Sequence, residues 1–264
     1  MENENTKPRR NIFLIVLISL AALFTIYFTV MSMLSPARKL DELKNEYAAK
    51  ASEKEKAGQP VLTDAAYLKL LKQKSFLQSR ILMAGTDSIY LTINLADSSA
   101  NLEISGVAVH KARMSDVKVS KILMEDNEKA ILSLLAKPFS INYARATIKK
   151  EPVMVKMAPK DTSEYKPDVM PDTSITEPVN YILEMTGGIR IYVYQSENVK
   201  FDDRVNQLRF DLTDRLNDTW SALKSVAVLK VPEYHPYIKM KLPRSDAKII
   251  YRAIPRNGQI AVFY

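Results

Sequence analysis

The stretch Val179–Gln195, VNYILEMTGGIRIYVYQ, carries the strongest signal for local structure in the chain. Two β-rich runs, in which apolar and polar residues alternate, flank Gly187 and Gly188. A period of two residues is typical of a strand with one buried face. A Gly-Gly pair suits a type I′ turn, because both central residues of that turn need positive φ. The stretch therefore predicts a β-hairpin.

A helix, a strand, a short helix and a final strand are expected after this hairpin. The run from about 203 to 224 has apolar residues at helical spacing, and we expect Trp220 to lie in the core. Apolar and polar residues alternate in YIKMKL at 237–242, which predicts a strand. Ser245 is expected to cap a short helix, and QIAVFY at 259–264 predicts the final strand.

Before the hairpin, a helix and several strands are predicted. The helix should begin at the N-cap Thr63 and end before Gly85. Its apolar residues fall on a and d positions of two heptads, interrupted by Lys74. We expect this helix to pack on the following sheet, with self-association as the alternative. Apolar and polar residues alternate in three runs that each predict a strand: SIYLTINL, NLEISGVAVHKARM and DVKVSKIL. A short helix near 127–135 and a strand after Pro138 complete the block.

A segment rich in proline, aspartate, serine and threonine separates these two blocks. Five of the thirteen prolines lie between Pro152 and Pro178. Such a composition favours an extended linker, or a strap over the surface.

The N-terminal part predicts a membrane anchor. Ile12 to Leu34 is a run of 23 residues without a charge, about 34 Å long as a helix, and a bilayer core is about 30 Å thick. The run is longer than the apolar part of a signal peptide, and no A-x-A cleavage pattern follows it. The polar, charged run after Pro36 predicts a solvated helical stalk.

The orientation of this anchor does not follow from counting basic residues, since three precede the span and four follow within about 20 residues. Lys7, Arg9 and Arg10 nevertheless lie directly against the span, and large domains after a first helix are translocated largely regardless of charge. We therefore expect a single-pass protein of the inner (cytoplasmic) membrane, with residues 35–264 in the periplasm.

Composition excludes several classes of site. The chain has no cysteine, two histidines and six glycines, so disulfides, thiol nucleophiles, Cys-ligated zinc and three-histidine metal sites are impossible, and no phosphate-binding glycine motif occurs. We expect no cofactor and no metal. The basic residues, which give the chain a net charge of +8, are interleaved with acidic residues along the sequence. A nucleic-acid-binding protein more often has a dense basic patch, so this pattern argues against a nucleic-acid partner. An ordinary solvated surface is favoured, and weak attraction to anionic lipid or a wall polymer is the alternative.

The candidate interaction loop is Glu233, Tyr234 and His235, between two prolines in PEYHP. We favour a structural role for this loop, for His110 on an alternating strand, and for Asp202 and Asp203 at a helix start. No nucleophile motif accompanies His235.

The ending PRNGQIAVF resembles the catalytic strand of L,D-transpeptidases, but Gln259 stands where their cysteine belongs and no HG pair precedes it, so that activity is not carried over. The arrangement of anchor, stalk and sheet region resembles uncharacterised single-pass envelope proteins of Gram-negative gut bacteria, a resemblance that implies no activity.

The sequence thus predicts an α+β protein with an N-terminal transmembrane helix, a helical stalk and a mainly antiparallel sheet with packed helices. We predict a non-enzymatic interaction or scaffold protein of the cell envelope, which contacts the bilayer through 12–34 and binds other envelope proteins. The alternative is a wall-directed hydrolase with a site near His235. The expected divisions are a tail (1–11), the span (12–34), the stalk (35–60), an α+β region (61–157), a linker or strap (158–178) and a second α+β region (179–264).

Overall fold

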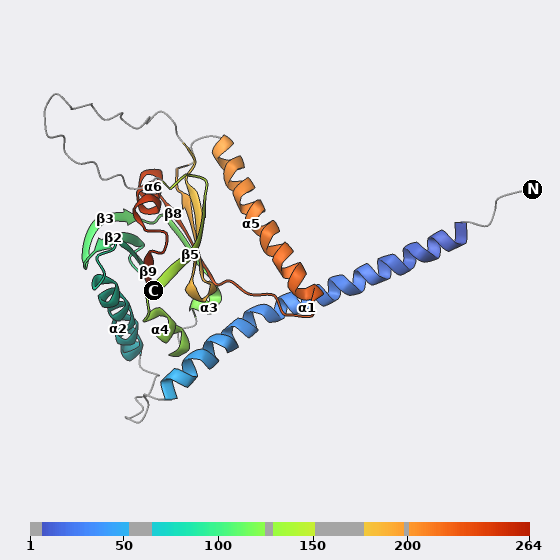
Figure 1. Cartoon of the computed structure of the whole chain (residues 1–264), viewed down its shortest axis with the longest axis horizontal. Helices are drawn as coiled ribbons and strands as arrows, with labels where there is room; N and C mark the ends of the chain where they lie inside the picture. Colours follow the sequence, from blue (N-terminus) through green and yellow to red (C-terminus); the bar gives the residue numbers. More distant parts are fainter. Residues whose placement is uncertain (1–6, 53–64, 125–128, 151–176, 198–200) are drawn as a thin grey trace, which may run out of the picture. The chain divides into compact units, whose positions relative to one another are not determined.

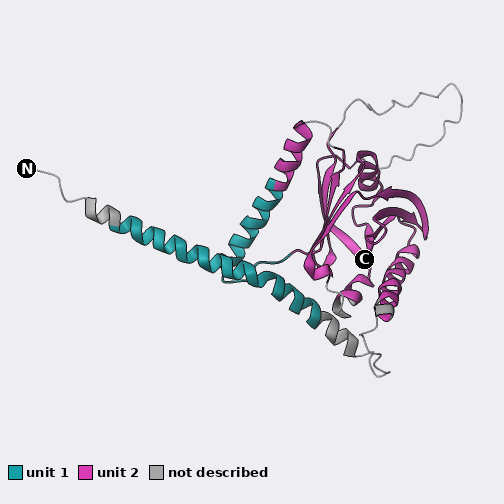
Figure 2. Cartoon of the chain, turned by 180° about the vertical axis from the view of Figure 1, so that it is seen from behind, with its two compact units in different colours: residues 1–46, 212–234 teal, residues 47–211, 235–264 magenta. Residues whose placement is uncertain are grey.

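The computed structural model describes residues 7–52, 65–124, 129–150, 177–197 and 201–264. The chain divides into two compact units, residues 1–46 with 212–234, and residues 47–211 with 235–264 (Figure 2). The prolines predicted to form a linker lie outside the described residues, apart from Pro178, and so does the predicted cap Thr63.

The described elements follow one another as shown in Figure 1. They are α1 (Lys7–Ser52), α2 (Ala65–Ala84), β1 (Tyr90–Asn94), β2 (Ser99–Ile104), β3 (Val107–Arg113), β4 (Asp116–Val119), α3 (Lys121–Met124), α4 (Lys129–Leu135), β5 (Phe139–Ala146), β6 (Asn180–Met185), η2 (Thr186–Gly188), β7 (Arg190–Gln195), α5 (Phe201–Ala227), β8 (Tyr237–Leu242), α6 (Arg244–Ala253) and β9 (Gln259–Phe263).

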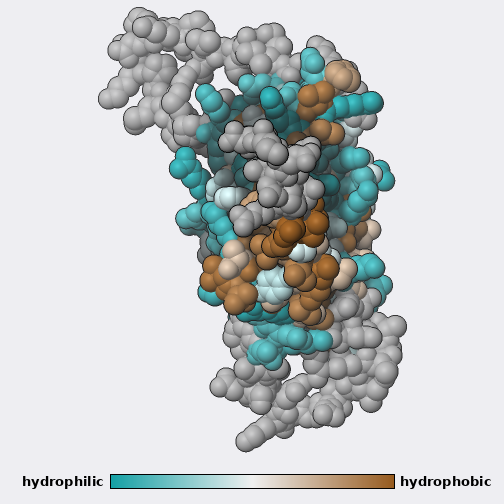
Figure 3. All heavy atoms as spheres, turned by 90° about the vertical axis from the view of Figure 1, so that its right-hand side faces the viewer, coloured by the Kyte–Doolittle hydropathy of each residue, from teal (hydrophilic) through white to brown (hydrophobic). Residues whose placement is uncertain are grey.

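Helix α1 is the one described helix that is long enough and apolar enough to cross a membrane. Its apolar side chains from Ile12 to Ile26 are exposed, and the space-filling view shows hydrophobic side chains gathered on the face turned to the viewer (Figure 3). The helix continues without a break through Pro36 into the predicted stalk. The predicted stalk is not solvated on every side, because Lys39 and Leu43 are buried.

The second unit contains a nine-stranded sheet in the order β3-β2-β1-β9-β5-β6-β7-β8-β4. Strands from both predicted α+β regions enter it, because the first residues of β5 pair with β9 and the later ones with β6. The α+β class is confirmed, but the sheet is mixed: β1 pairs with β9 and β7 with β8 in parallel, and the other pairs are antiparallel. Helix α5 forms the crossover between β7 and β8, as parallel neighbours require.

Several local predictions need correction. NLEISGVAVHKARM is not one strand but the hairpin β2–β3, which turns at Ser105 and Gly106 with positive φ at both residues. DVKVSKIL is the short strand β4 followed by α3. Ser245 does not cap α6, because Pro243 occupies the N-cap and no side chain bonds there. Trp220 is exposed and is not a core residue.

The hairpin at 179–195 forms as predicted, with a longer loop. Gly187 and Gly188 both have positive φ, but they belong to the 3-10 turn Thr186–Gly188, and the Met185 N–H donates to the Ile189 carbonyl at 2.8 Å. Both strands are buried almost throughout. This burial on both faces accounts for their β-branched and aromatic content.

Candidate interaction face on α2

Helix α2 packs on the sheet through one face. Met83 is fully buried in a cluster with Tyr90 of β1 and Ala261 of β9, and Phe76 packs against that cluster. The ring centroids of Phe76 and Phe263 lie 5.3 Å apart. The predicted packing of this helix on the sheet is therefore confirmed.

The heptad residues predicted to mediate that packing point elsewhere. Leu70, Leu77 and Ile81 are 62%, 50% and 70% exposed, and Lys74 between them is exposed as well. At about 3.6 residues per turn these four residues share one side of the helix, opposite Phe76 and its buried neighbours. We call this set the heptad face of α2.

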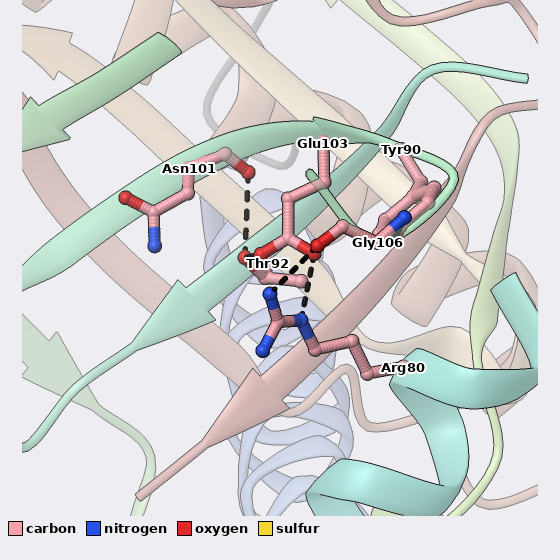
Figure 4. A network of polar contacts seen from close by, with 6 residues as sticks. All are labelled: Arg80, Tyr90, Thr92, Asn101, Glu103 and Gly106. Carbon is pink, nitrogen blue, oxygen red and sulfur yellow. Dashed lines mark hydrogen bonds and ion pairs between the residues drawn. The ribbon is translucent and has the colours of Figure 1, made fainter. Parts of the chain in front are cut away.

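A buried polar network fixes α2 in this orientation (Figure 4). The Arg80 Nε lies 2.7 Å from the Glu103 carboxylate on β2, and its Nη2 donates to the Gly106 carbonyl at 3.2 Å. The side chain of Glu103 is 3% exposed and that of Arg80 is 34% exposed. A buried carboxylate needs such a partner, because an unpaired buried charge is strongly destabilising.

Two further side chains complete the network. The Thr92 hydroxyl donates to the second Glu103 oxygen at 2.8 Å, and the Tyr90 hydroxyl accepts the Gly106 N–H at 2.9 Å. Burial raises the pKa of the Tyr90 phenol above its ordinary value, so the hydroxyl stays protonated at neutral pH. The network joins α2 to the β2–β3 turn, and the heptad face is therefore held on a fixed platform.

Two hydrogen bonds hold the β8 end of the loop predicted as a candidate site. The Nδ1 of His235 lies 3.0 Å from the Gly188 carbonyl, and the Arg190 N–H donates to the Pro236 carbonyl at 2.8 Å. Glu233 is exposed, and Tyr234 is half-buried. The histidine ring thus joins the β8 end of the loop to the β6–β7 turn.

The other singled-out residues make structural contacts. The Nε2 of His110 on β3 lies 3.3 Å from a carboxylate oxygen of Asp246 on α6. Asp202 and Asp203 lie in the first turn of α5, as expected for carboxylates at a helix start, and Asp203 pairs with Arg244 at 3.1 Å. In the described part of the chain, no group of three or more histidine or acidic side chains could hold a metal ion.

The sequence predicted that the heptad face would pack on the sheet, but the structure packs the opposite face of α2 there. The signal that could have separated the two faces is the pair Phe76 and Met83, an apolar pair seven residues apart that lies off the heptad positions. No family model, curated protein or solved structure matches this chain.

Proposed function

We propose that this chain is a membrane-anchored interaction or scaffold protein of the bacterial cell envelope, held by residues 12–34 in the inner membrane with its folded region in the periplasm. The observation that carries this proposal is the heptad face of α2. A helix that buries one face on a sheet and exposes a second apolar face has a surface ready for a partner.

The partner that fits this face is an amphipathic helix. Tyr67, Leu70, Lys74, Leu77 and Ile81 follow a and d positions, the spacing by which one helix accepts the side chains of another. Lys74 occupies an a position, where two copies of this helix in parallel would place two ammonium groups together. A partner helix with an acidic side chain opposite Lys74 is therefore favoured over a second copy.

The test is site-specific photo-crosslinking in cells. A photoreactive residue at Leu77 should yield a crosslinked protein partner, whereas one at Gln73, on the flank of the same helix, should yield less. Lys74→Glu should abolish the Leu77 crosslink because it reverses the charge, and Lys74→Arg should preserve it. Equal crosslinking at both positions, or indifference to Lys74→Glu, would refute the proposed face.

Topology needs its own test. A reporter that is active only in the periplasm, fused after Tyr264, should be active, and the mature protein should retain residues 12–34. Cytoplasmic fluorescence from the same position would refute the proposed orientation. The wall-directed hydrolase with a site near His235 stays the alternative proposal, and the His235 substitution described in the Discussion addresses it.

A further inference from the structure

Helix α5 has two faces of opposite character. On its inner face Phe210 packs against the cluster of Tyr192 and Tyr194, and Asp211 accepts a hydrogen bond from the Tyr194 hydroxyl at 2.7 Å. The Asp203–Arg244 ion pair lies on the same side. The inner face therefore holds α5 on the sheet with both apolar and polar contacts.

The outer face carries large apolar side chains that are all between 46% and 80% exposed. We call them the outer stripe of α5: Phe201, Val205, Leu208, Leu212, Leu216 and Trp220. They follow one another at intervals of three or four residues, so they form one continuous stripe along the helix. A stripe of this length, with an aromatic residue at each end, is unusual for a surface that faces only water.

The charges bordering this stripe are mainly basic. Arg204, Arg209 and Arg215 each lie three or four positions from a member of the stripe, which places them along its borders. Asp203 and Asp211 instead point to the inner face. Asp202, which is exposed and lies three positions from Val205, is an acidic side chain on the same border. Three basic side chains against this one acid at the border of an apolar helix face suit a surface of phosphate headgroups.

The segment that follows α5 is tied to the end of the apolar span within the first unit. Ser35 directly follows the span, and its buried hydroxyl donates to the Pro232 carbonyl at 2.7 Å. On this side of α1, Tyr27 and Met31 are half-buried and Ser35 is buried, at intervals of four residues. Figure 2 shows the C-terminal part of α5 meeting α1 in this unit. This bond ties the segment that follows α5 to the end of the span.

The turn after α5 presents more apolar surface near this bond. Val228 and Leu229 are 67% and 76% exposed, and Leu229 has a φ of 59°. Three residues of chain reach at most about 11 Å, so Leu229 lies within that distance of Pro232 along the backbone. The headgroup region of a bilayer is about 5–8 Å thick on each side of the hydrocarbon core. The turn is thus within reach of the lipid surface.

Trp220 completes this pattern. The Lys224 Nζ lies 5.5 Å from the centroid of its ring, and tryptophan with a neighbouring lysine is typical of the membrane–water interface. We propose that the part of the outer stripe within the first unit, Leu212, Leu216 and Trp220, and the Val228–Leu229 turn lie in the headgroup region of the bilayer that α1 spans, which makes the C-terminal part of α5 an interfacial helix. This inference rests on the proposed membrane anchoring.

The test uses the full chain reconstituted in vesicles, because Trp220 is the single tryptophan. Its fluorescence, excited selectively, should be blue-shifted, shielded from iodide in the water, and quenched at least twofold by lipids brominated near the headgroup end of their acyl chains. Leu216→Gln should reduce the bromine quenching, whereas Asn217→Gln, a matched control at a neighbouring exposed position, should not.

Each contrary result has a distinct meaning. Emission typical of water with strong iodide quenching would overturn the inference, because Trp220 would then face solvent. A blue shift without bromine quenching would also overturn it, since a protein surface would then cover the stripe. Release of the chain from vesicles by an alkaline wash would instead refute the membrane anchoring, and it is measured before any fluorescence is recorded.

Discussion

Arg80 and Glu103 form one ion pair, but removing the arginine should lower the free energy of unfolding more than removing the charge of the glutamate. Arg80→Met leaves the Glu103 carboxylate buried without its cationic partner, although the Thr92 hydroxyl still donates to it. Removing one partner of a buried pair costs about 3–5 kcal/mol, and we expect about 3 kcal/mol because Arg80 is partly exposed. Glu103→Gln removes the buried charge itself and leaves an arginine that still reaches water and the Gly106 carbonyl. That change should cost only about 1.5 kcal/mol, the value of a hydrogen bond to a charged group.

The assay is urea unfolding of the full chain in a mild detergent, followed by far-ultraviolet circular dichroism. Hydrogen exchange of the β1–β3 peptides should show the same ranking locally. The double variant should lose about 2 kcal/mol, less than the two single losses combined, because neither charge is then left unpaired. If Glu103→Gln were as destabilising as Arg80→Met, or if the two losses added, the carboxylate would not be the costly partner and the reasoning would fail.

Three further predictions follow from matched positions. Tyr181 and Tyr90 are both buried, but within the described residues the Tyr181 hydroxyl has no hydrogen-bond partner. Tyr181→Phe should therefore be neutral or stabilise the protein by up to about 1 kcal/mol, whereas Tyr90→Phe should cost about 1 kcal/mol in the same urea titration. Gly258→Ala should cost about 1–3 kcal/mol, because a Cβ there collides with the preceding turn; Gly85→Ala, where the nearest atom is 3.6 Å away, should be tolerated. His235→Ala removes one hydrogen bond and should lower stability by about 1 kcal/mol or less. Loss of the cellular role with a nearly unchanged melting temperature would support a binding or catalytic site in this loop, as the hydrolase alternative requires.

The elements that sequence reasoning predicted well are those whose own residues determine them. The apolar run of α1 and the alternating strands around Gly187 and Gly188 need no distant partner to be recognised. The parallel pairs of the sheet are different, because β1, at residues 90–94, pairs with β9, at residues 259–263. Alternation shows that a segment is a strand, but it does not show which neighbour it has or in which direction that neighbour runs.

The faces of the helices were harder to assign than the helices themselves. The heptad of α2 is present, but Phe76 and Met83 proved to be the buried side, since packing depends on the shape of the sheet beneath. Trp220 lies on correct helical spacing and is still exposed, whereas Phe210 and Asp211 of the same helix contact the strands. An apolar stripe predicts a covered face but does not say whether protein or lipid covers it.

The position of β9 in the sheet has a consequence for the order of folding. This strand is inserted between β1 and β5, and Ile260 pairs with both Leu91 and Phe139. During synthesis β1 and β5 are therefore complete long before the strand that separates them exists. Until β9 arrives, each of them presents an open backbone edge, and such edges recruit other strands into aggregates. Closing a sheet through its most distant pairing is also slow, so a factor that shields a nascent chain should matter more for this fold than its final stability would indicate.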